Sequence, residues 1–486
     1  MSLTIGLDIA KQGLRTTAQQ TALLTRNVTR VDDPFASRKV ASLTSLVNGG
    51  VKLGPVRRLA DQALLENLMK SASGYEAKRA ISSALNALDA TVGNPELGAS
   101  PAAVVQDLLN NLQEFAARPH DPIAARALFE SAQRVVVGLN DASAEVRQVR
   151  ERADGEIALS VENLNRMLKE FEAVNQAIVK GTRSGLDVTD ELDMRDQLLR
   201  SISAEVEVRT VMRADGDMAI FLSSGVTLFD KTARDVSFVL TPTLLAGQSG
   251  HQVYVDGVPM SKSVSGRIAG LLEVRDTIAP TYQKQLDEIA RGLIEIFAET
   301  DQSAVPTLPP LPGLFTANGL AGVPASGVAV AGLAASIRVN PNVDPDAGGD
   351  LMRLRDGGIS DPGNPAYLYN VGGSASYNER LHELLEGFST ARSFDITAQA
   401  GASATLINYA SASGGWLGEA RVAAKNDADL RGTVVSRSIE ALTNATGVNL
   451  DEEMSLLLDL ERSYQASSRL ISTIDNMFIA LFNATG

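Results

Sequence analysis

The chain has 486 residues, more than one hydrophobic core usually organises, which predicts two to four domains. Its formal net charge of -14, with no basic run, argues against nucleic acids and anionic membranes as partners. The absence of cysteine excludes disulfides, thiolate nucleophiles and cysteine-ligated metals, and the aromatic fraction of only 5% predicts an aliphatic, helix-packed core.

The first predicted element is a helix at the start of the chain. Its apolar stripe includes Leu3, Leu7, Leu14 and Leu24 and alternates spacings of four and three residues, as coiled-coil helices do. Pro34 follows soon after and predicts that the helix has ended. The segment lacks the basic start and continuous apolar stretch of a Sec signal, and no stretch of the chain approaches the roughly 18 apolar residues of a membrane span.

Helices are also predicted through the first half of the chain. Residues 60–135 contain helical patterns, with Pro122 at a helix start, and residues 140–181 carry a long apolar stripe at helical spacing. A last helix is predicted at 191–206. The pattern then changes to alternation typical of strands, which extends to about residue 262.

The predicted β segment contains a hairpin turn at Asp215-Gly216, a pair that favours tight turns. Residues 266–300 return to a helical pattern. Residues 301–375 are rich in Pro, Gly, Ala and Asn and predict loops with short strands. From about residue 377 the chain is again predicted to be helical, with a long helical stretch from about 403 to the terminal segment.

The last predicted helix carries the clearest heptad stripe of the sequence. Eight of its ten seam positions are apolar. The seam consists of Leu450, Glu453, Leu457, Leu460, Tyr464, Ser467, Ile471, Ile474, Phe478 and Leu481. Because the first helix has a similar stripe, we expect the two terminal helices to pair as a stem. Few side chains are buried for the number of residues ordered, so we expect this stem to be weak in a monomer and firm in a polymer.

The predicted fold class is α+β and mainly α-helical, with paired N- and C-terminal coiled-coil helices, a second layer of long helices and an inserted β-rich outer domain. The chain divides into four predicted parts. They are the terminal helical stem (1–30 plus 447–486), the helical second layer (31–190 plus 266–300 plus 377–446), a β-hairpin subdomain attached to that layer (191–265), and a Gly/Pro-rich β/loop outer domain (301–376).

Four stretches match, in chain order, the motifs of one known family. After the first helix comes NVTRVDDPFASRK, where the residues that fit the N-terminal signature of axial flagellar proteins are Asn27, Val28, Pro34, Ser37 and Arg38. Two central segments, LQEFAARPHDPIAARALFESAQ and ELDMRDQLLRSISAEVEV, also fit. The best match is the C-terminal GVNLDEEMSLLLDLERSYQASSRLISTIDNMF. The chain therefore resembles the family of flagellar hook-associated protein 1, the hook–filament junction proteins.

The resemblance implies a structural adaptor with no catalysis and no cofactor, located outside the cell in the flagellum and exported by the flagellar type III apparatus without a Sec signal. It would assemble with copies of itself on the hook protein, receive hook-associated protein 3, and form an inner tube from its terminal helices. A cytoplasmic export chaperone would hold the C-terminal helix. The predicted assembly interface consists of Leu3, Leu7, Leu14, Leu24, Asn27, Leu450, Leu457, Leu460, Tyr464, Ile471, Ile474, Phe478 and Leu481.

Two alternatives remain open on the sequence. The chain could be another axial flagellar protein, such as hook protein or hook-associated protein 3, or an enzyme with a helical oligomerisation stem. The three histidines are isolated in sequence, and the acids of NVDPDAGGD lack the spacing of a calcium-binding loop. No metal site is therefore expected, and no nucleophile, base and orienting group come together in the sequence.

Overall fold

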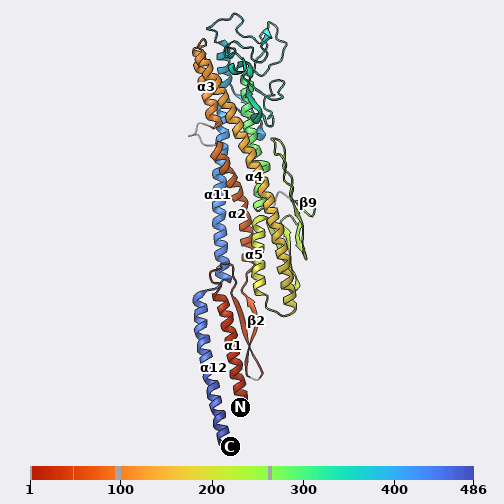
Figure 1. The fold of residues 1–486 in the computed structure, drawn as a ribbon, viewed down its shortest axis with the longest axis vertical. Coiled ribbons are helices and arrows are strands. Elements are labelled where there is room, and N and C mark those ends of the chain that lie inside the picture. The colour runs from red at the N-terminus through yellow and green to blue at the C-terminus, as the bar shows by residue number, and fades with distance from the viewer. Residues whose placement is uncertain (1–2, 48, 93–99, 261–264, 486) are drawn as a thin grey trace.

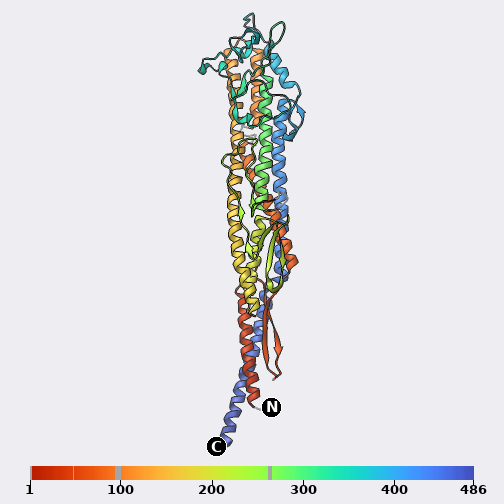
Figure 2. The ribbon, with the colours of Figure 1, turned by 90° about the vertical axis from the view of Figure 1, so that its right-hand side faces the viewer.

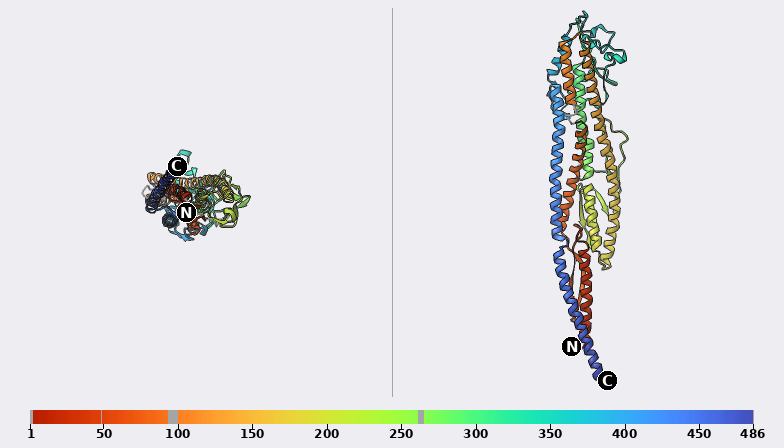
Figure 3. Two further views of the ribbon diagram at one scale, coloured as in Figure 1. Left: turned by 90° about the horizontal axis from the view of Figure 1, so that it is seen from below. Right: turned by 60° about the vertical axis from the view of Figure 1, so that its left-hand side comes forward.

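The computed structural model describes residues 3–47, 49–92, 100–260 and 265–485. These residues form an elongated rod in which long helices run along one axis (Figures 1 and 2). The first helix begins, and the last helix ends, at the same end of the rod. Two helices and a hairpin extend from a thicker helical body, and the fold therefore has a slender stem at one end (Figure 3).

The stem and the body are built from helices that come from both halves of the chain. The long helices are α1 (Leu3–Val28), α2 (Gln62–Val92), α3 (Pro101–Ala117), α4 (Pro122–Arg183), α5 (Thr189–Glu205), α7 (Ala279–Ile296), α10 (Glu379–Ser389), α11 (Leu406–Thr446) and α12 (Leu450–Thr485). The shorter helices are α6 (Arg267–Glu273), α8 (Leu333–Ser336) and α9 (Arg353–Asp356). In the body, α11 packs along α2, and α4 contacts α3, α5 and α7.

Helix α4 runs along the body as one continuous helix of 62 residues. Asp121 caps it by accepting a hydrogen bond from the Ile123 amide at 2.8 Å, and Pro122 occupies its first turn, where a missing amide costs nothing. The sequence predicted the start at Pro122 and the long stripe from 140, but not their continuity. Gly138 between them costs the helix only about 1 kcal/mol, which packing on both sides offsets.

The stripe predicted for α4 faces the core. Val174 is only partly buried, and every other member of the stripe is buried. The buried members are Val146, Val149, Ala153, Ile157, Val161, Leu164, Leu168, Phe171 and Ile178. The side of α4 opposite to this stripe is charged, as expected for a helix at the surface of a bundle. The long-helix layer is thus held by one aliphatic core.

A hairpin between the stem and the body was not among the predicted elements. Strands β1 (Lys39–Ser45) and β2 (Val51–Arg58) pair antiparallel, with Lys39 opposite Arg58 and Ser45 opposite Val51. A two-stranded hairpin is marginal alone, and this one lies against α1, where the Thr16 hydroxyl donates to the Val51 carbonyl at 2.8 Å. Its stability therefore depends on a tertiary contact.

The remaining strands form small antiparallel sheets. β3 (Val208–Met212), β4 (Met218–Leu222), β5 (Thr227–Asp230) and β6 (Thr232–Ala233) form a four-stranded sheet, and β7 (Val236–Ser237), β8 (Tyr254–Val255) and β9 (Val258–Pro259) a three-stranded one. Asp215, in the β3–β4 turn, has φ 59° and Gly216 has φ 77°, as the Asp-Gly pair predicts. Both sheets lie along α4.

The end of the rod far from the stem is formed by short elements and loops (Figure 1). It contains the pairs β10 (Phe315–Ala317) with β11 (Ile337–Val339), and β12 (Arg392–Ser393) with β13 (Ser403–Ala404). Buried acids anchor these loops to the body. Asp287 of α7 accepts hydrogen bonds from the Gly332 and Ala334 amides, both at 2.9 Å.

Candidate assembly site: the terminal stem and its joint

The two terminal helices pair antiparallel. A Cβ placed on Gly6 would lie 3.6 Å from Ile474, one placed on Gly13 would lie 3.7 Å from Ser467, and Asn27 donates to Glu453 at 3.2 Å. The contact positions therefore advance along α1 by as many residues as they go back along α12, which is the register of an antiparallel pair. Glycine at the first two positions lets the helices approach closely, since no side chain separates them there.

The predicted interface residues occupy different depths in this stem. Leu24, Asn27 and Ile474 are buried. The half-buried members are Leu3, Leu7, Leu14, Leu457, Leu460, Ile471 and Phe478. Leu450, Tyr464 and Leu481 are exposed. The seam thus faces α1 along most of its length, but one stem does not cover it completely.

Helix α12 carries further apolar side chains on both sides of the seam. At 100° per residue, Met454, Leu458 and Ile479 fall on one flank, and Leu470 and Met477 on the other. All five are between 43% and 53% exposed. The back of the helix is different, because it carries the small or polar residues Ser455, Arg462, Ala466, Arg469 and Thr473. An isolated stem therefore leaves two apolar flanks in water.

Asn27 lies at the top of the stem, where the two helices meet the hairpin. Its amide nitrogen donates to the Lys39 carbonyl at 3.0 Å and to Glu453, and its amide oxygen accepts from the Lys39 amide at 2.9 Å. Glu453 is buried and also accepts from Arg38 Nε at 2.6 Å. Asn27 therefore ties together α1, β1 and α12, a role that a side chain without both a donor and an acceptor could not fill.

A second cluster joins the stem to α5 of the body. The Asp193 carboxylate is 4% exposed and is paired with Lys39, itself 2% exposed, and with Arg30 and Arg58 at 3.3 and 3.2 Å. The Ser37 hydroxyl donates to it at 2.5 Å. These partners come from the loop after α1, from β1 and from β2. One buried carboxylate therefore connects that loop and both strands of the hairpin to α5.

Further acids of α5 extend the cluster to its rim. Asp190 pairs with Arg26 and Arg30 at 2.5 and 2.9 Å, and Arg58 pairs with Asp196 at 2.6 Å. Burial acts to lower the pKa of Arg58, but the neighbouring Asp196 and Asp193 carboxylates outweigh it and raise this pKa. The guanidinium therefore stays charged at the joint.

The loop after α1 is also fixed to the opposite side of the body. The Arg38 amide donates to the Thr446 carbonyl at 2.8 Å, and the Thr443 hydroxyl donates to the Pro34 carbonyl at 3.0 Å. The Arg200 guanidinium of α5 lies 3.1 Å from the centroid of the Phe35 ring, a cation–π distance. The joint thus contacts both α5 and the end of α11.

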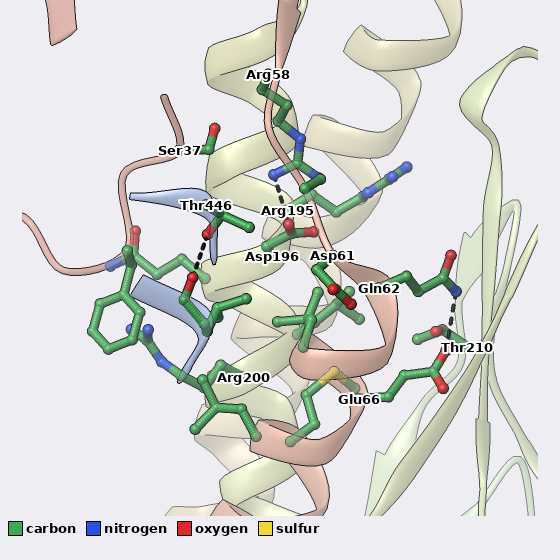
Figure 4. A pocket seen from close by; sticks show the side chains of 18 of the residues that line it. Ser37, Arg58, Asp61, Gln62, Glu66, Arg195, Asp196, Arg200, Thr210 and Thr446 are labelled. Carbon is green, nitrogen blue, oxygen red and sulfur yellow. Dashed lines mark hydrogen bonds and ion pairs between the residues drawn. The ribbon is translucent and has the colours of Figure 1, made fainter. Parts of the chain in front are cut away.

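A cavity of about 260 Å³ lies at this joint (Figure 4). Its apolar wall is formed by Leu65, Leu68, Met69, Leu199 and Met218, among others, and its polar edge by Arg58, Asp61, Glu66, Asp196 and Arg200. Figure 4 shows Arg58 paired with Asp196 across it. Ser37 also lines the cavity, but its hydroxyl donates to Asp193 inside the ion-pair cluster. We assign the cavity no catalytic chemistry.

Arg195 also lines the cavity and is almost completely buried. It donates to the Gly216 carbonyl at 2.6 Å, and its Nε has no hydrogen-bond partner among the described residues. Burial lowers the pKa of Arg195 to about 10, and the guanidinium remains charged near neutral pH. It holds the β3–β4 turn against α5.

Other classes of site find little support in the described part of the chain. His120, His251 and His382 are all exposed and lie in different segments. No group of three or more potential metal ligands occurs among the residues that the structure places. Within the same residues, no helix is long and apolar enough to cross a membrane.

The sequence reasoning missed the joint, although it contains a signal for it. The acids Asp187, Asp190, Asp193 and Asp196 recur every third residue, which places most of them on one face of a helix. Their basic partners are dispersed through residues 26–58. The number of acids on this helix face is similar to the number of their basic partners in the linker. This charge complementarity would have predicted a contact between the two segments.

The antiparallel terminal helices, the long-helix body and the charged joint define an elongated, mainly helical subunit with a slender terminal stem. A family model described as the flagellar hook-associated protein FlgK helical domain matches residues 66–307. A second, described as the flagellar basal body rod FlgEFG protein C-terminal, matches residues 441–483. The chain belongs to the family of flagellar hook-associated protein 1.

Relatives found by sequence are named flagellar hook-associated protein 1. Flagellar hook-associated protein 1 of Bacillus subtilis (strain 168) is 21% identical over 533 aligned positions, covering 100% of this chain and 99% of that protein. Its counterpart in Escherichia coli (strain K12) is 25% identical over 57% of this chain and 50% of its own length. A solved flagellar hook junction protein FlgK from Burkholderia pseudomallei aligns over 52% of this chain and 47% of its own, with 20% identity and a TM-score of 0.44.

Proposed function

We propose that this protein is the structural adaptor that assembles on the hook tip and joins the hook to the filament of the bacterial flagellum. Family membership supports this role, and the stem carries it physically. Its seam is turned toward α1, while the flanks that include Met454 and Met477 are exposed on both sides. Two apolar flanks separated by a polar back suit a helix that has a neighbour on either side, as in a closed ring or tube.

The interface that we propose consists of these flanks together with the seam residues predicted from the sequence. Copies of the chain would pack laterally through the stems, with hook protein on one side of the ring and hook-associated protein 3 on the other. The long-helix body would form a second layer outside the stems. The loops at the far end would then face away from the axis.

We also propose that α12 is covered before export by a cytoplasmic chaperone, and that the chain leaves through the flagellar type III apparatus without a Sec signal. The physical support is the exposed apolar surface on α12, which includes Leu458, Leu470 and Ile479. In a monomer at cellular concentration such surface favours aggregation. A partner that binds a single amphipathic helix in a groove would suppress it.

The deciding experiment is electron microscopy of cells that lack this gene. Hooks of normal length without filaments, with unassembled flagellin in the medium, would support the junction role. Absent hooks would instead favour a hook or rod protein. Intact flagella would contradict the proposal, and a search for ligand binding or turnover would then test the alternative of an enzyme with an oligomerisation stem.

A further inference from the structure

The tip of the β1–β2 hairpin presents apolar side chains that the chain itself does not cover. Leu43 and Ser45 share one face of β1, and Val47 lies in the turn that follows the strand. Leu43 is 52% exposed and Val47 is fully exposed. The other side of the tip rests on the stem, because a Cβ on Gly49 would lie 3.5 Å from Ile9. The tip is thus anchored on α1 and open on its outer face.

The joint cavity lies at the opposite end of the same hairpin. Arg58, the last residue of β2, lines it together with Leu59. Its apolar wall includes Leu65, which is half-buried, and Leu68 and Met69, which are buried. Its volume of about 260 Å³ is below the roughly 300–1,000 Å³ of small-molecule sites, and is a size suited to a few side chains.

We infer that the joint cavity receives the hairpin tip of a second copy of this chain. The eight residues of β2 span about 26 Å. A tip therefore cannot reach the cavity of its own molecule. A copy shifted along the rod axis by roughly one hairpin length, in the same orientation, places its Val47 at the level of this cavity. Such a head-to-tail contact builds rings or helical tubes, and the inference thereby rests on the proposed function.

The charges of the two surfaces are complementary. Lys52, opposite Thr44 near the tip, is the only charged residue between Lys39 and Arg57. At the edge of the cavity, Asp61 and Glu66 are exposed and form no ion pair with other described residues. Of the basic residues there, Arg58 pairs with Asp193 and Asp196, and Arg200 lies over the Phe35 ring. The two exposed acids are thus available to Lys52.

Cysteine cross-linking in assembled flagella tests this contact. The chain has no cysteine of its own, and the two positions are too far apart within one molecule for a disulfide, which needs Cα atoms within about 7 Å. Flagella are isolated from cells that carry the full-length Val47→Cys, Leu65→Cys variant and are mildly oxidised. We expect a fraction of disulfide-linked dimers at least tenfold above that of a control pair, Val47→Cys with Leu159→Cys, whose second position is exposed on α4.

Normal filaments with no more cross-linking than the control pair would overturn the inference while leaving the junction role intact. A second variant covers the case in which the cysteine pair does not assemble. Val47 is exposed in the monomer, so Val47→Asp should leave folding unchanged but bury a charge at the contact. We expect at least fivefold fewer cells with filaments than for Val305→Asp at the far end. Equal filament counts for the two variants would overturn the inference. Equal counts are also expected if a small molecule, and not the hairpin tip of a second copy, fills the cavity.

Discussion

Replacing Asp193 by alanine should loosen the stem from the body. The side chains of Asp193 and Lys39 are 4% and 2% exposed, so the variant leaves a buried ammonium whose remaining carboxylate neighbour, Asp190, is 3.6 Å away. Breaking a buried pair from one side costs about 3–5 kcal/mol, much of it from the desolvated charge that remains. Arg30 and Arg58 contribute less to this loss, because each keeps a second carboxylate at a shorter distance, 2.9 Å for Arg30 and 2.6 Å for Arg58.

The exposed pair Arg26–Asp187 offers a matched control. Its side chains are 30% and 34% exposed, and exposed pairs contribute only about 0–1 kcal/mol. Amide hydrogen exchange of the full-length monomer, followed in β1 and in the loop after α1, reports local opening without assuming two-state unfolding. At about 1.4 kcal/mol per factor of ten, Asp193→Ala should speed exchange there by at least roughly 100-fold, and Asp187→Ala by less than about 10-fold.

A compensating variant separates charge from shape. Lys39→Met with Asp193→Leu replaces the buried pair by apolar side chains, an exchange that is often neutral. It should restore most of the protection that Asp193→Ala removes. If Asp193→Ala opened the joint no more than Asp187→Ala, the buried cluster would not be what holds the stem to the body, and the reasoning would fail.

Three further predictions concern the stem and the outer loops. Asn27→Ala removes three buried hydrogen bonds and should destabilise the top of the stem by about 1–3 kcal/mol, seen as faster amide exchange in β1 and early α12; unchanged exchange would contradict the role given to Asn27. Leu457→Asp should abolish filaments while the circular dichroism of the body is retained, whereas Ser455→Asp on the polar back should be tolerated, and filaments on both would contradict the interface. Burial raises the pKa of Asp287 to about 6, so its protonated form is favoured in the fold. The stabilisation that protonated Asp287 gives the fold is complete below the unfolded pKa of about 4, and the free energy of unfolding falls by about 3 kcal/mol as pH rises through 6. Thermal unfolding of wild type relative to Asp287→Asn between pH 4 and 7 should show this loss. Parallel stability curves for the two proteins would refute the prediction.

The pairing of the terminal helices could be predicted from the sequence because spacing alone encodes it. Leu3, Leu7 and Leu14 at one end and Leu457 and Ile474 at the other mark seams that have no other place in the chain to be buried. The register was not predictable in this way. It is set by contacts that involve small or polar side chains, such as Gly6 against Ile474, and these do not stand out in a hydrophobic pattern.

The hairpin and the joint show why other parts could not be predicted. β1 and β2 become a stable hairpin by packing on α1, and their pattern alone does not specify this tertiary contact. The Asp193 cluster gathers partners that lie 135 to 163 residues away in the chain. The acids of α5 were visible in the sequence, but their partners are defined only when the stem meets the body.

The joint explains how one subunit can transmit order along an axis. Buried apolar contacts on the flanks of α12 would tolerate sliding between neighbouring stems, since dispersion and burial are weakly directional. The ion pairs around Asp193 are directional and connect the stem, the hairpin and α5 at one point. If neighbours pack through the stems, the joint fixes where each body and each hairpin tip must lie. A flexible joint would allow many offsets between copies, whereas a joint held by directional ion pairs would restrict them.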